Sequence, residues 1–246
     1  MEPVNPALSV VLPVHNEENH LEEAVSRIIV ALDEPEVILV DDGSLDHSFT
    51  LMKSLADRYL GVRVLRLDGN YGQQNATLAG LLYARGGWVC TMDADLQHPP
   101  EALPVLLAAA AEGADVVYGV SAGLSRKPLR RLGSGLRDLV FRAILKKPAG
   151  LRLSSFRVIR GEVIHKLRIP KFAFVYVSAE LLTVTRRIVS VPVYMNPSPH
   201  KTGGYSFGAL ARLLVNVVIH YGALPGLKKH RLPGPPYRIS EVYPCA

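Results

Sequence analysis

The stretch WVCTMDADLQHPP spans residues 88–100 and decides the fold. Its apolar beginning, residues 88–92, predicts a buried β-strand, because short continuous apolar runs are typical of strands covered on both faces. Two aspartates, Asp93 and Asp95, follow where this strand ends. Pro100 then suits the first turn of a helix, where its missing N–H costs little. The stretch therefore predicts a strand, a polar loop and a helix in succession.

The same succession repeats on both sides of this stretch. Apolar runs predict further strands at residues 8–12, 37–40, 62–67 and 116–119. Amphipathic spacing predicts a helix at 18–32, and we expect further helices at 48–59, 73–84 and 100–111. Alternating strands and helices predict an α/β fold of the doubly wound Rossmann-like kind, with a mostly parallel sheet and helices on both faces. The polar segments after the strands should then meet at one edge of the sheet.

The second half of the chain is less regular. We expect a basic helix at 125–147, then strand, helix and strand at 156–160, 174–185 and 188–194. We therefore expect three parts: one main domain at 1–204, an amphipathic helix at 205–225 and a flexible basic, proline-rich tail at 226–246. On the helix, Arg212, Asn216 and His220 form a polar stripe that suits a membrane surface. A helix packed on the core is the alternative.

Composition narrows the function. The chain has 246 residues, 48% of them hydrophobic and 20% charged, with a net charge of +6, so it is not disordered and suits anionic ligands. We find no signal peptide and no apolar run long enough to span a bilayer. These features predict a cytoplasmic protein, peripheral at the membrane if it binds one.

Asp93 and Asp95 are the strongest functional signal. Residues two apart in an extended chain point to the same side, and two carboxylates there repel unless a cation lies between them. Oxygen ligands favour Mg²⁺ or Mn²⁺, and Gln97 is close enough to add one. A solvated acidic turn is the alternative, but the position after a strand favours a metal site.

Other polar positions suit a nucleotide. Asp42 follows the strand at 37–40 and could bind a base or ribose, or form an ordinary Asx turn. Glu17 could touch the nucleotide or cap its own helix. Pro13 shapes the loop that follows the strand at 8–12. The loop at 70–75, with Asn70, Gly72 and Gln73, precedes a helix and could bind an anion.

Glu180 lies within an otherwise apolar helix. Such a carboxylate is either a general base for a hydroxyl acceptor or part of an ion pair, for which Arg157 is a candidate partner. We count Glu180 and Arg157 with Asp95 as candidate catalytic residues.

These motifs, in this order, resemble family 2 glycosyltransferases of the GT-A fold, and most closely the polyprenyl (dolichyl) phosphate sugar synthases. The resemblance extends over about residues 7–210 and is most specific in the first hundred. The matching segments are 9–18, 40–44, 70–73, 92–101, 115–119 and 155–157.

The resemblance implies an inverting transfer from a GDP- or UDP-sugar, with Mg²⁺ or Mn²⁺, to a lipid phosphate. By match, Asp93, Asp95 and Gln97 would hold the metal. The nucleotide pocket would be lined by Pro13, Glu17 and Asp42, with His15 at a place where an aromatic side chain often stacks.

Three departures concern the acceptor side. Leu151 stands where relatives carry an acidic residue, and a phosphate-gripping arginine is missing from 198–206, where His200 and Lys201 are possible substitutes. Many bacterial relatives also continue into two spanning helices. A soluble transferase acting on a small hydroxyl compound is therefore one alternative. A non-catalytic nucleotide-binding subunit is another, which the intact Asp-Ala-Asp disfavours.

Overall fold

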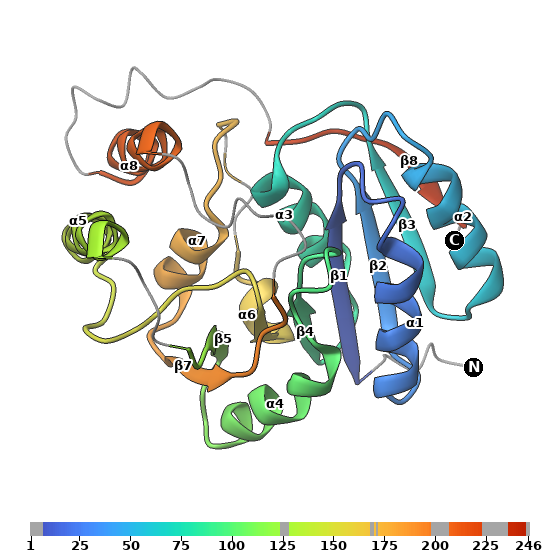
Figure 1. Cartoon of the computed structure of the whole chain (residues 1–246), viewed down its shortest axis with the longest axis horizontal. Coiled ribbons are helices and arrows are strands. Elements are labelled where there is room, and N and C mark those ends of the chain that lie inside the picture. Colours follow the sequence, from blue (N-terminus) through green and yellow to red (C-terminus); the bar gives the residue numbers. More distant parts are fainter. Residues whose placement is uncertain are drawn as a thin grey trace.

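The computed structural model describes residues 7–123, 128–167, 170, 172–197, 207–222 and 236–244, without the side chains of 128–136, 207 and 209. Within these residues, eight strands form one sheet in the order β7-β5-β6-β4-β1-β2-β3-β8 (Figure 1). The strands are β1 Leu8–Val14, β2 Glu36–Asp41, β3 Val62–Leu67, β4 Trp88–Thr91, β5 Val116–Ser121, β6 Arg157–Arg160, β7 Ile188–Val193 and β8 Ile239–Tyr243.

The sheet is mixed, with parallel pairing in its centre. β1 pairs in parallel with β2 and β4, β2 with β3, and β5 with β7. β6 runs antiparallel between β4 and β5, and β8 runs antiparallel to β3. Since β2 and β4 lie on opposite sides of β1, the strand order reverses there, which is where open α/β sheets bind ligands. The predicted α/β architecture is confirmed.

Helices cover both faces of the sheet. The helical segments are α1 Leu21–Ala31, α2 Ser48–Arg58, α3 Gln73–Tyr83, η1 Pro100–Ala102, α4 Leu103–Ala111, α5 Pro128–Leu145, α6 Gly161–Ile164, α7 Val177–Val184 and α8 Phe207–Tyr221. One apolar core joins α1, α2 and α4 to the sheet, and the other joins α3 and α5 to α8 (Figure 1). Helix boundaries predicted in the first half agree to within a few residues.

Helix α3 lies unusually close to the centre of the sheet. A Cβ atom at Gly80 would come within 2.3 Å of Val11 Cγ1 on β1 and 3.0 Å of Val40 Cγ2 on β2. Only glycine permits this approach, because any larger side chain would push the helix away. The close packing places the N-terminus of α3, with Gln73, directly beside the end of β1.

The tail predicted to be flexible contains a strand. Residues 239–243 form β8 at the sheet edge, where Lys53 Nζ lies 2.7 Å from Glu241 Oε1 and Tyr243 Oη donates to Asp57 Oδ1. Part of the tail is thus ordered by pairing with β3. A run of five residues, two of them polar, is too short for its periodicity to stand out in a proline-rich segment.

The polar stripe predicted for α8 does not lie on one exposed face. Arg212 is exposed, but His220 is 2% exposed and its ring lies 5.0 Å from the rings of Phe172 and Phe174. Helix α8 packs on the core through this end, as the alternative reading expected. Among the residues described, none of the helices has both the length and the apolar character needed to cross a bilayer.

Candidate donor and metal site

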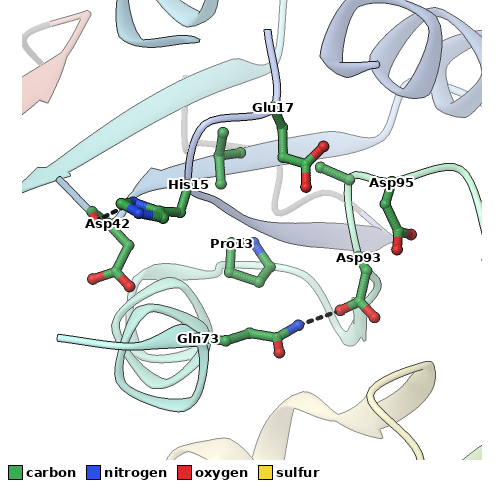
Figure 2. Close-up of a pocket in the computed structure, with 9 residues that line it drawn as sticks. Pro13, His15, Glu17, Asp42, Gln73, Asp93 and Asp95 are labelled. Atoms are coloured by element: carbon green, nitrogen blue, oxygen red, sulfur yellow. Dashed lines mark hydrogen bonds between the residues drawn. The ribbon is translucent and has the colours of Figure 1, made fainter. Parts of the chain in front are cut away.

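A cleft opens at the carboxyl ends of β1, β2 and β4. Its volume is about 270 Å³, and it is lined by Pro13, Val14, His15, Glu17, Asp42, Gln73, Asp93, Ala94 and Asp95 (Figure 2). Seven of these nine residues are ones that the sequence singled out; Val14 and Ala94 are the additions. Parallel strands ending at one edge bring together side chains that are far apart in the sequence.

Asp93 is held from both sides of its carboxylate. Gln73 Nε2 donates to Oδ1 at 2.5 Å, and Ser155 Oγ donates to Oδ2 at 2.9 Å. Each carboxylate oxygen has about two lone pairs, so each keeps one for another ligand. The role of Ser155 was missed in the sequence, although its Ser-Phe-Arg segment was noted.

His98 supports the loop that carries the two aspartates. Its Nδ1 accepts the backbone N–H of Asp93 at 3.0 Å, and its ring stacks on Phe156 with centroids 5.0 Å apart. Asn196 also binds this loop, with its side-chain amide donating to Leu96 O at 2.8 Å. His98 is thus placed as a structural residue, which agrees with the absence of a second histidine nearby in the sequence.

Asp95 is the second carboxylate of the cleft. Its Oδ1 accepts the backbone N–H of Gln97 at 3.1 Å, and its Oδ2 accepts the side-chain amide of Gln97. Leu96 between them has φ of 63°, so the loop turns sharply here. Gln97 is placed as the partner of Asp95, and a role for it in direct metal binding stays a prediction.

Asp93 and Asp95 fit a hard divalent cation. Among the described residues no group of three or more His, Cys, Asp or Glu could hold an ion by itself. Mg²⁺ characteristically binds one or two carboxylates and takes its remaining ligands from water and substrate phosphates. Two carboxylates with spare lone pairs, in a cleft large enough for a diphosphate, match that pattern.

Asp42 lies at the other end of the cleft. Its Oδ1 accepts the backbone N–H of Tyr71 at 2.7 Å, whereas the Asx turn at this position is made by Asp41, whose Oδ1 accepts the Ser44 N–H at 3.0 Å. Burial raises the pKa of Asp42, and the backbone N–H groups of Tyr71 and Gly72 partly oppose this. A buried carboxylate that does not form its own turn is free to accept from a ligand.

Hydrogen bonds to both nitrogens of its ring position His15. Its Nδ1 lies 2.9 Å from Asp42 O, and its Nε2 lies 3.1 Å from Asn70 Nδ2 and 3.2 Å from Asn16 Nδ2. Since the amide groups donate to Nε2, Nδ1 is the nitrogen that donates to Asp42 O. The exposed ring presents a flat face near Asp42, where a base could stack (Figure 2).

Glu17 and the loop before α3 complete the cleft. Glu17 does not cap α1 with its side chain; its backbone N–H donates to Ser48 Oγ at 2.9 Å, and its carboxylate faces the cleft (Figure 2). Gly72 has φ of 85°, and Asn70 Oδ1 accepts its N–H at 3.1 Å. This turn places Gln73 where its side chain donates a hydrogen bond to Asp93.

The two other candidate catalytic residues lie outside the cleft. Glu180 Oε1 accepts from Tyr221 Oη at 2.7 Å, and burial raises its pKa, partly offset by that hydrogen bond. Arg157 is 2% exposed and donates to Thr91 Oγ1 and Ser178 Oγ, each at 3.0 Å. The ion pair expected between them is not formed. His200 and Lys201 lie outside the described residues.

Comparison with protein families identifies related sequences. The family described as glycosyl transferase family 2 matches residues 9–164. An undecaprenyl-phosphate 4-deoxy-4-formamido-L-arabinose transferase of Edwardsiella ictaluri (strain 93-146) is 33% identical over 221 residues, covering 86% of this chain and 66% of that protein. One from Shewanella sediminis (strain HAW-EB3) is 38% identical over 154 residues, covering 61% of this chain and 45% of that protein. The chain thus spans at most about two thirds of the length of these relatives.

Solved structures with the same fold include nucleotide complexes. Glucosyl-3-phosphoglycerate synthase from Mycobacterium tuberculosis, with Mn²⁺, UDP and phosphoglyceric acid, matches with a TM-score of 0.65 and 22% identity over 89% of this chain and 80% of that one. A mannosyltransferase from Pyrobaculum calidifontis, with GDP-Man and Mn²⁺, matches with a TM-score of 0.57 and 18% identity over 89% of this chain and 64% of that one. At these identities the likeness shows the fold alone, and it is the GT-A fold predicted above.

Proposed function

The chain belongs to glycosyl transferase family 2, and we propose that it transfers a sugar from a nucleoside diphosphate sugar to a polyprenyl phosphate, with Mg²⁺ or Mn²⁺. The observation that carries this proposal is that Asp42 and the pair Asp93 and Asp95 line one cleft. A donor needs contacts for its nucleoside at one end and for its diphosphate at the other. The undecaprenyl-phosphate acceptor in the names of the relatives supports a lipid phosphate here.

Six polar residues in or beside the cleft have a defined task in this proposal. Asp42 accepts a hydrogen bond from the base or ribose, and His15 offers its ring for stacking. Gln73 and Ser155 orient the carboxylate of Asp93. A divalent ion held by Asp93 and Asp95 would stabilise the negative charge that develops on the departing diphosphate.

The acceptor phosphate needs no strong general base. A phosphate oxygen is already anionic at neutral pH and can attack the anomeric carbon directly, whereas a hydroxyl acceptor must lose a proton. Glu180, the candidate base, does not line the cleft and already accepts from Tyr221 Oη. Its position therefore favours a phosphate acceptor over a hydroxyl.

We expect Glu180→Gln to keep kcat within about threefold of wild type, because Gln retains an oxygen that accepts from Tyr221 Oη. A positioned general base contributes roughly 10²- to 10⁴-fold. Steady-state kinetics with the acceptor of the wild-type enzyme, together with Tm, measure the effect. A loss of about 100-fold with an unchanged Tm would restore Glu180 as a base and favour a hydroxyl acceptor.

We also propose that the protein associates peripherally with a membrane surface through α5 and α8. These helices pack together, and Leu139 and Val215 on them are 64% and 56% exposed. Apolar side chains flanked by cations such as Arg142 and Arg212 suit an anionic bilayer surface.

We expect the protein to sediment with vesicles containing anionic lipid, and the double variant Leu139→Asp/Val215→Asp to bind at least about tenfold more weakly. Both residues are exposed, so Tm should change little. The matched control is Leu45→Asp/Leu60→Asp, which alters two exposed leucines of the β2–α2 and α2–β3 connections. Equal losses in both double variants would mean that charge alone, and not this surface, determines vesicle binding.

The deciding experiment follows a labelled sugar from UDP- and GDP-sugars in the presence of Mn²⁺, with and without a polyprenyl phosphate in detergent. Label in the organic phase would support lipid-phosphate transfer and identify the donor at the same time. Metal-dependent release of nucleoside diphosphate without a lipid product would contradict the lipid acceptor and favour a small hydroxyl compound. No turnover of any donor would contradict the enzyme assignment.

A further inference from the structure

Arg157 is a buried cation without an ion-pair partner among the described residues. Its side chain lies in the core between β6 and α7 and is 2% exposed, and its hydrogen-bond partners among the described residues are two hydroxyl groups. Burying a guanidinium away from a carboxylate is costly, and such groups are usually paired. The fold therefore tolerates an unpaired buried charge at this position.

The partners of Arg157 lead toward the metal site. Arg157 Nε donates to Thr91 Oγ1 at 3.0 Å, and Thr91 Oγ1 donates to the backbone oxygen of Ser155 at 2.5 Å. Ser155 Oγ in turn donates to Asp93 Oδ2 at 2.9 Å. The first two hydrogen bonds thus fix the backbone of the residue whose side chain makes the third.

The direction of these hydrogen bonds is set by chemistry. A guanidinium only donates, so Thr91 Oγ1 must accept from Arg157 and direct its own proton elsewhere. An ionised carboxylate only accepts, so Ser155 Oγ must donate to Asp93. Hydrogen bonds to charged groups are stronger than neutral ones, and this applies to the bond that Arg157 donates and to the bond that the Asp93 carboxylate accepts. The arrangement leaves a single set of proton positions.

The neighbouring strands support the same geometry. Thr91 and Arg157 are paired residues of β4 and β6, and Tyr118 of β5 is the partner of Arg157 on its other side. Asp93 comes two residues after Thr91, just beyond the end of β4. The guanidinium lies 5.8 Å from the centre of the Tyr118 ring, a contact that favours a cation at this place.

We propose that Arg157 and Thr91 are positioning residues for the metal site: through Ser155 they hold the carboxylate of Asp93 in the orientation that binds the divalent ion. This inference rests on the proposed function, because it assumes that Asp93 is a metal ligand. Arg157 is not a catalytic residue in this account, since it does not touch the cleft. Partners of metal ligands commonly affect metal affinity by about 10- to 100-fold.

The test is the dissociation constant of Mn²⁺ for the 246-residue chain, measured by electron paramagnetic resonance with Mn²⁺ alone. We expect Thr91→Val, which keeps the shape but removes the hydroxyl, to weaken Mn²⁺ binding by about tenfold. Thr91→Ser, which restores the hydroxyl, should bind like wild type. Ser155→Ala should weaken binding to a similar extent and serves if Thr91→Val does not fold.

Thr185→Val is the matched control. Like Thr91 Oγ1, Thr185 Oγ1 accepts one hydrogen bond and donates another: it accepts the backbone N–H of Arg187 at 3.1 Å and donates to Asp115 Oδ2 at 2.5 Å. This arrangement lies at the start of β5, whereas the cleft lies at the carboxyl ends of the strands. The variant should lose stability without a change in Mn²⁺ affinity.

Two other outcomes separate the possible failures. If wild type binds Mn²⁺ and Thr91→Val binds it within about twofold while its Tm falls, Arg157 and Thr91 serve only the stability of the fold, and the positioning role is overturned. If wild type does not bind Mn²⁺ at all, the metal assignment in the proposed function fails, and the positioning role fails with it.

Discussion

Replacing Asp95 with alanine is expected to lower sugar transfer by about 10³-fold while the protein stays folded. Asp95 and Asp93 are the two carboxylates of the cleft that suit a hard divalent ion. Metal stabilisation of a developing charge contributes several kcal/mol, and about 4 kcal/mol corresponds to roughly 10³-fold in rate. The measurement is labelled-sugar transfer at saturating Mn²⁺.

A second variant separates the charge of Asp95 from its structural contacts. Asp95 Oδ1 accepts the N–H of Gln97, so alanine also removes a hydrogen bond from the loop. Asp95→Asn keeps an oxygen at that position but loses the negative charge. Both variants should lose transfer, and only Asp95→Ala should disturb the loop. Asp57→Ala on α2 is the control for removing a carboxylate elsewhere. Wild-type transfer by Asp95→Asn would exclude Asp95 as a metal ligand.

The residues of the candidate site were predictable because they follow the ends of strands. Each polar group after β1, β2 and β4 lies within a few residues of an apolar run, and parallel pairing brings those ends together. Asp93, Asp95, Asp42 and His15 could therefore be placed on one edge without coordinates. The helix that begins at Gln73 was also predicted.

The supporting contacts were not predictable in the same way. Ser155 reaches Asp93 across 62 positions of sequence, and this depends on β6 inserting antiparallel beside β4. Antiparallel insertion of a four-residue strand leaves no distinctive pattern in an otherwise parallel α/β sequence. For the same reason Arg157 was predicted to pair with Glu180, because the two side chains have opposite charges, although they form no ion pair in the structure.

The C-terminal helix shows a different limit of prediction from sequence. His220 was placed on a polar stripe because i and i+4 spacing puts it in line with Asn216 and Arg212. The structure buries His220 between two phenylalanine rings, and its Nδ1 lies 2.9 Å from Asn216 O, so this histidine lies in the core. Periodicity identifies a helix but does not say which face its neighbours cover.

Replacing Asp42 with asparagine is expected to weaken binding of the donor nucleotide by at least about tenfold and, at neutral pH, to raise Tm. A hydrogen bond to a charged group contributes roughly 1.5–3 kcal/mol, which corresponds to about 10- to 100-fold in affinity. Asparagine keeps an oxygen for the N–H of Tyr71, so the loop should stay in place.

The sign of the stability change follows from the pKa of Asp42. Burial raises the pKa of this carboxyl above its ordinary value, so the folded state binds the proton more tightly than the unfolded state. Stability therefore falls as the pH rises through the window between the ordinary pKa and the raised one. At neutral pH the ionised Asp42 destabilises the fold, and asparagine removes that cost. The gain in Tm should shrink as the pH falls through the same window.

Asp41→Asn is the matched control, because Asp41 is the adjacent aspartate but has a cation beside it. Its Oδ2 lies 3.2 Å from Arg66 Nε, and its side chain is fully buried. Neutralising Asp41 should lower Tm, whereas neutralising Asp42 should raise it. Calorimetry across pH and titration with UDP and GDP measure both effects. A fall in Tm for Asp42→Asn with unchanged nucleotide affinity would mean that this carboxylate supports the loop rather than the ligand. The opposite signs expected at two neighbouring aspartates distinguish a carboxylate kept for a ligand from one kept for the fold.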